Sequence, residues 1–119
     1  MHNTVYTIEK IKDVVKPIAA KYNAESIYLF GSYARGDANE NSDLDFLVFG
    51  GDNFKLTNIF ALAEDLRTAF ERQVDVFEIS EINTDSDFYS TIMSERLNVA
   101  WNTLINSVFK KYVNMQRNF

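Results

Sequence analysis

Two stretches of the sequence decide the fold: GSYARGD at residues 31–37 and DLDFLVF at residues 43–49. The first follows a β-rich run at residues 25–30, and the second alternates, so that every other side chain falls on one face. This period predicts one strand that ends at the Gly-Ser pair and another that begins near the first aspartate. Side chains two positions apart on a strand share a face, so we expect Asp43 and Asp45 to project together.

The residue types in these stretches are typical of phosphate and metal chemistry. A Gly-Ser turn between a strand and a helical turn exposes backbone N–H groups and a hydroxyl, which can cradle a phosphate. Two neighbouring carboxylates repel each other unless a cation lies between them, and oxygen ligands of this kind suit Mg²⁺. Asp75, on a third predicted strand at residues 74–79, shares a face with Phe77 and Ile79, and a carboxylate there can accept a proton from an attacking hydroxyl. Together these are the components of in-line phosphoryl or nucleotidyl transfer.

The rest of the chain is consistent with one α/β domain. Pro17 lies inside the first apolar stripe and predicts a kink or a restart of that helix. Leu97, Val99 and Trp101 indicate a short last strand. The element order predicts an α/β fold of the α+β type, with a small mixed or antiparallel sheet of three to four strands flanked by helices. Apolar residues at helical spacing predict the helices, at residues 7–22, 54–72, 85–96 and 103–115.

Composition limits the classes of protein to which the chain can belong. Its 119 residues are 46% hydrophobic and 14% aromatic, which favours a single globular domain over residues 1–119. A membrane helix needs about 18 apolar residues in a row, and no run here approaches that length. The chain has no cysteine, which excludes thiolate chemistry and favours a cytoplasmic protein. Its net charge of −5 argues against direct binding of nucleic acid.

The motif itself resembles a known signature. Gly-Ser followed by ten residues and Asp-x-Asp is similar to the signature of the polymerase-β-like nucleotidyltransferase superfamily, and the fuller string GSYARGDANENSDLDFLV looks like its minimal nucleotidyltransferase (MNT) branch, the MntA-type antitoxins encoded beside HEPN toxins. The resemblance covers roughly residues 8–101 and implies a single minimal nucleotidyltransferase domain. It also implies roles for individual residues: nucleotide binding by Gly31, Ser32 and Arg35, and catalysis and metal binding by Asp43, Asp45 and Asp75.

The resemblance implies an activity as well. It is that of a Mg²⁺-dependent nucleotidyltransferase, with two ions, that transfers AMP from ATP to a tyrosine hydroxyl of a partner HEPN ribonuclease toxin and thereby acts as its antitoxin. Two alternatives stay open: an antitoxin that neutralises the toxin by binding alone, and a stand-alone enzyme that adenylylates a small hydroxylated molecule. Mn²⁺ would suit the same oxygen ligands.

Overall fold

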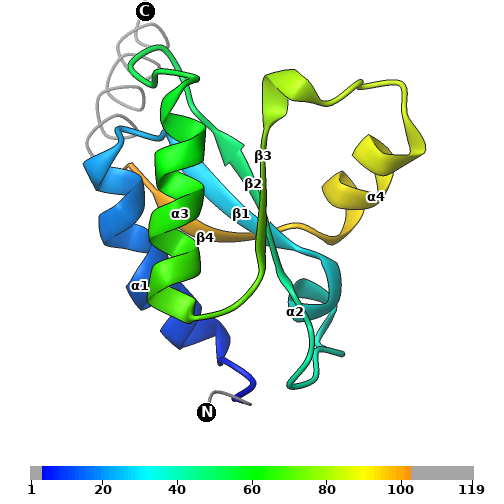
Figure 1. Ribbon diagram of the computed structural model, residues 1–119. Coiled ribbons are helices and arrows are strands. Elements are labelled where there is room, and N and C mark those ends of the chain that lie inside the picture. Colours follow the sequence, from blue (N-terminus) through cyan, green and yellow to red (C-terminus); the bar gives the residue numbers. More distant parts are fainter. Residues whose placement is uncertain (1–3, 103–119) are drawn as a thin grey trace, which may run out of the picture.

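The computed structural model describes residues 4–102, which form a four-stranded sheet with helices on both faces (Figure 1). The strands are β1 (Ser26–Phe30), β2 (Leu44–Phe49), β3 (Val74–Glu78) and β4 (Leu97–Trp101), and their order across the sheet is β3-β2-β1-β4. β1 is antiparallel to β2 and to β4, whereas β2 is parallel to β3. The mixed α/β fold that the sequence predicts is therefore confirmed.

Two helices cover one face of the sheet (Figure 1). α1 (Ile8–Lys21) begins after Thr7, whose hydroxyl accepts a hydrogen bond from the amide of Lys10 at 3.1 Å. Pro17 lies inside this single helix, so the chain does not restart there. α3 (Asn58–Phe70) begins later than the apolar spacing predicts, because turns occupy the residues before it.

The main core lies between this pair of helices and the sheet. Alternate strand positions supply its sheet side, as the period of two predicts. The two helices are also joined at the surface, where the Lys21 ammonium and the Tyr22 hydroxyl both donate to Asp65 Oδ2 at 2.7 Å. The largest fully buried members of the main core are Ile11 and Val15 of α1, Leu62, Leu66 and Phe70 of α3, and Ile27, Leu29, Leu44, Phe46 and Val48 of the sheet.

Within residues 4–102, the opposite face of the sheet is covered only in part. α4 (Asp87–Glu95) packs there, and its Ile92 forms a second, smaller core with Phe30 and Leu47. The short helix α2 (Gly31–Arg35) continues directly from β1 and contacts α4. A 3₁₀ turn, η1 (Ile79–Glu81), follows β3. This sparsely covered face is the one on which the predicted site residues of β2 and β3 lie.

Other elements follow the sequence with shifted ends. The helix predicted at residues 85–96 is α4, and the short last strand is β4. The helix predicted at residues 103–115 lies outside the described residues. Within residues 4–102, no helix has the length and apolar character needed to cross a membrane.

Candidate active site

Asp45 and Asp75 lie side by side on neighbouring strands. The parallel register of β2 and β3 pairs them directly, on the face where α4 packs. Both side chains are partly buried. Burial, followed by the charges of Asp75 and Asp43, raises the pKa of Asp45 to about 6, and the charge of Arg35 acts in the opposite direction. The site therefore concentrates negative charge at a place where solvent screens it poorly.

Asp43 stands one position before β2 and is exposed. Its carboxylate acts on Asp45 through charge, as the raised pKa of Asp45 shows. Among the residues that the structure describes, no three acidic or histidine side chains are grouped so that they could hold a metal ion as they stand. The donor chemistry still suits a hard divalent cation, because two adjacent carboxylates repel each other and a cation would relieve that repulsion.

The Gly-Ser turn approaches the acidic pair closely. β1 ends at Phe30, which is paired with Asp45 across the antiparallel register, and Gly31 follows with φ +75°. A Cβ atom at position 31 would overlap Asp45 Oδ2, so only glycine allows the backbone to lie this near the carboxylate. Ser32 comes next, partly exposed, and its carbonyl accepts hydrogen bonds from the amides of residues 36 and 37 at 3.0 Å.

Arg35 and the Gly31 amide share one acidic partner. Gly31 N donates to Glu95 Oε1 at 2.9 Å, and Arg35 Nη1 lies 3.3 Å from Glu95 Oε2. Arg35 Nε also pairs with Asp37 Oδ2 at 3.3 Å. Arg35 is thus the cation nearest in sequence to the Gly-Ser turn, and its charge reaches Asp45.

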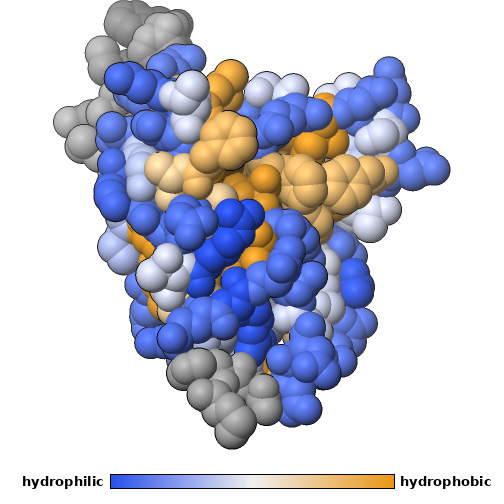
Figure 2. All heavy atoms as spheres, in the orientation of Figure 1, coloured by the Kyte–Doolittle hydropathy of each residue, from blue (hydrophilic) through white to orange (hydrophobic). Residues whose placement is uncertain are grey.

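Aromatic rings border the acidic pair. Phe30 lies beside Asp45 in the register, and Phe77 follows Asp75 on the same face of β3. Phe88 of α4 meets both rings edge to face, with centroids 6.0 Å from Phe30 and 5.3 Å from Phe77, and it is 43% exposed. Hydrophobic side chains gather between β3 and α4 in Figure 2. We call Phe30, Phe77 and Phe88 the aromatic wall.

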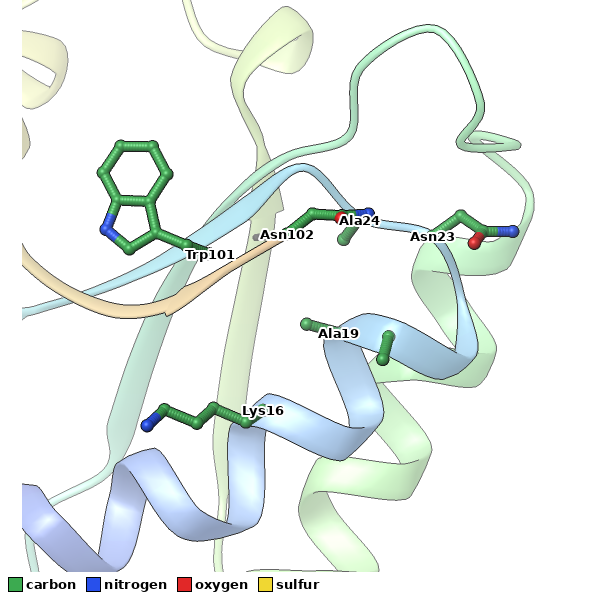
Figure 3. Close-up of a pocket in the computed structure, with 7 residues that line it drawn as sticks. Lys16, Ala19, Asn23, Ala24, Trp101 and Asn102 are labelled. Carbon is green, nitrogen blue, oxygen red and sulfur yellow. The ribbon is translucent and has the colours of Figure 1, made fainter. Parts of the chain in front are cut away.

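The hollow drawn in Figure 3 is a different feature. It has a volume of about 270 Å³ and lies between α1 and β4, with Lys16 and Trp101 on opposite sides. None of the predicted site residues lines it. The candidate site is therefore part of the open sheet face and not of this hollow.

The structure brings most of the predicted residues together. Asp45, Asp75 and Gly31 are in direct proximity, and Arg35 is within electrostatic reach of Asp45. Asp43 is at the margin. The sequence reasoning missed Glu95, which is 64 residues from Gly31 along the chain, so no local pattern indicates their contact.

The comparisons with known proteins identify the family of the chain. A family model described as "Polymerase beta, Nucleotidyltransferase" matches residues 9–100, and the chain belongs to this family. The class of enzyme that the Gly-Ser and Asp-x-Asp spacing predicts is thereby confirmed.

Two relatives carry more specific names. The chain is 34% identical over 76 residues to a protein of Methanocaldococcus jannaschii provisionally named protein adenylyltransferase MJ0435, a match that covers 64% of this chain and 82% of the relative. It is 36% identical over 58 residues to protein adenylyltransferase MntA of Shewanella oneidensis, which covers 49% of this chain and 42% of MntA. The chain thus spans less than half the length of MntA.

Solved structures share the fold. A toxin-antitoxin crystal structure with AMP-PNP has a TM-score of 0.64 at 22% identity, covering 90% of this chain and 87% of that one. A complex of the tri-AMPylated Shewanella oneidensis HEPN toxin with its MNT antitoxin has a TM-score of 0.61 at 18% identity, covering 94% and 88%. A minimal nucleotidyltransferase has a TM-score of 0.65 at 25% identity, covering 79% of this chain and 97% of the other. The architecture is that of a minimal nucleotidyltransferase.

Proposed function

We propose that this chain is a Mg²⁺-dependent protein adenylyltransferase that transfers AMP from ATP to a tyrosine hydroxyl of a partner HEPN toxin and so acts as its antitoxin. The observation that carries the proposal is the pairing of Asp45 with Asp75 directly beside the Gly31 turn. Relatives that are named protein adenylyltransferases support the protein acceptor. The solved complex that contains an AMPylated HEPN toxin supports the class of partner.

We assign each residue of the site a separate role in the reaction. Asp45 and Asp75, with Asp43 and the nucleotide's phosphate oxygens, would hold Mg²⁺, which supplies charge neutralisation to the phosphates when bound. The Gly31-Ser32 turn binds the phosphates through the amide and hydroxyl of Ser32, since the Gly31 amide already donates to Glu95, and Arg35 adds positive charge. The tyrosine oxygen attacks the α-phosphorus, the bond to the β-phosphate oxygen breaks, and pyrophosphate leaves. Asp75 accepts the tyrosine proton.

The aromatic wall supports an aromatic acceptor. Phe77 follows Asp75 on the same face of β3 and packs against Phe88, so a tyrosine ring whose hydroxyl reaches Asp75 can pack edge to face beside them. The open sheet face also leaves room for a protein surface, since α4 covers only part of it. On this open face, few side chains of the described residues would surround a small hydroxylated molecule.

A transfer assay tests the proposal. The purified chain is mixed with ATP, Mg²⁺ and a purified HEPN toxin, and the mass of the toxin is then measured by mass spectrometry. We expect the toxin to gain AMP on a tyrosine, and the Asp45→Asn variant to slow the transfer by about a hundredfold or more. The exposed turn variant Asp52→Asn is the matched control. An unchanged toxin mass with the wild-type chain would refute the proposal, and full protection of cells by Asp45→Asn would favour neutralisation by binding alone.

A further inference from the structure

We propose that Glu95 is a positioning residue of this site: it holds the Gly31 amide and the Arg35 guanidinium in the arrangement that receives the triphosphate. The inference rests on the proposed function. Its basis is a pair of contacts from one carboxylate, with Glu95 Oε1 2.9 Å from Gly31 N and Glu95 Oε2 3.3 Å from Arg35 Nη1. Two of the three residues assigned to nucleotide binding therefore depend on a single side chain of α4.

The placement of Glu95 is unfavourable for its own helix. It is the last residue of α4, where the helix dipole is negative, and the last turn of α4 has no basic residue. Its side chain is only 15% exposed, and a carboxylate so placed is stable only when it is paired and hydrogen-bonded. The contacts with Gly31 and Arg35 supply that pairing, so they account for the position of Glu95 better than helix stability does.

Gly31 is held from two sides. On one side its amide donates to Glu95, and on the other its Cα lies against the Asp45 carboxylate, where a Cβ would overlap Oδ2. Glu95 therefore sets how closely the phosphate-binding turn approaches the acidic pair. It does so from α4, through the backbone of Gly31, without being in contact with the reacting atoms itself.

The same contacts allow the opposite behaviour, which an experiment can distinguish. A carboxylate on Gly31 N and Arg35 would compete with a phosphate if the nucleotide had to displace it. A positioning residue strengthens nucleotide binding, whereas a competitor weakens it. Removal of the side chain therefore changes the KM for ATP in opposite directions under the two interpretations.

The test compares Glu95→Ala, Glu95→Gln and the control Glu64→Gln, which alters an exposed glutamate of α3. We expect Glu95→Ala to raise the KM for ATP by about tenfold, the effect of one lost charge-assisted hydrogen bond, with a smaller change in kcat. Glu95→Gln keeps an oxygen acceptor for Gly31 N and should recover most of the loss. A purely structural role would lower the amount of folded, active enzyme without this selective rise in KM.

A second measurement makes the inference independent of turnover. The Gly31 amide is followed by ¹H–¹⁵N NMR in wild type and both variants, and its resonance should move in Glu95→Ala and stay near the wild-type position in Glu95→Gln. A lower or unchanged KM for ATP in Glu95→Ala overturns the inference, as does an unmoved Gly31 resonance. Absence of AMP transfer by the wild type would instead refute the proposed function, and the Gly31 resonance would then decide on the Glu95 contact alone.

Discussion

Asp45 and Asp75 lie side by side on the parallel strands β2 and β3. Both side chains are on the sheet face opposite α1 and α3. Because Asp45 is partly buried and lies close to the charge of Asp75, its ionised form is destabilised and its pKa rises to about 6. This electrostatic cost is a measurable property of the folded chain. It also explains why binding of a divalent cation would be favourable there.

The metal-free chain should lose stability as the pH rises from about 4 to about 6. Folding raises the pKa of Asp45 from 3.8 to about 6, so the folded chain keeps a proton there that the unfolded chain releases. This contribution is complete below the unfolded pKa and is lost as the pH passes the folded pKa. We expect about 1–2 kcal/mol, after reduction for solvent screening.

Urea denaturation in the presence of a chelator measures this contribution. The free energy of unfolding of Asp45→Asn should change less steeply over the same pH range than that of the wild type. Asp52→Asn, which alters an exposed turn, should follow the wild type. A slope that is equal in Asp45→Asn and wild type would contradict the prediction.

Mg²⁺ together with a non-hydrolysable ATP analogue should raise the melting temperature of the wild-type chain, because a ligand that binds only the folded state stabilises it. Asp45→Asn and Asp75→Asn should lose most of this rise. Thermal denaturation with and without the ligands measures the effect, with Asp52→Asn as the control. Equal shifts in all four proteins would show that the ions bind elsewhere.

Gly31→Ala should abolish transfer and lower the free energy of unfolding by about 2–4 kcal/mol, since it combines a strained φ with an overlap at Asp45. Gly36→Ala is the matched control, because Gly36 has φ +85° but nothing within 4 Å of its Cβ position. It should cost about 1 kcal/mol and leave most of the activity. The difference between the two variants, measured by denaturation and transfer assay, isolates the close approach to Asp45. Similar effects of both would mean that only backbone strain matters.

Phe88→Ala should raise the KM for the toxin several-fold while the KM for ATP stays near its wild-type value, if the proposed acceptor ring packs against the aromatic wall formed by Phe88 and its two neighbours. Phe60→Ala is the control: that ring is 78% exposed on α3, away from the site. Initial rates at varied toxin and varied ATP give both constants. A selective rise in the KM for ATP would place the adenine against Phe88 instead.

The sequence predicts what depends on local period and misses what depends on packing between distant segments. Alternation along each strand correctly assigns Asp45 and Asp75 to the faces opposite Phe46 and Val76, because the period of two is a property of the strand alone. The register that sets the two acids side by side arises only when β3 pairs with β2. The helix predicted at residues 54–72 is also shorter in the structure, because turns precede α3.

The sequence likewise predicted only some of the residues of the candidate site. Spacing within one motif identified Gly31 and Asp45, since both belong to segments adjacent in the chain. Asp43 proved to precede β2 and to be exposed, because the strand begins one residue later than the alternation implies. The sequence could not predict the role of Glu95, since its contact with Gly31 depends on how α4 packs against the sheet.

The incomplete cover that α4 provides affects how much ATP the protein consumes in the cell. A reaction centre open to bulk water offers ATP a competing acceptor at all times, namely water itself. We expect the docked acceptor protein to cover the site and exclude water, so that ATP hydrolysis competes with transfer only until the complex assembles.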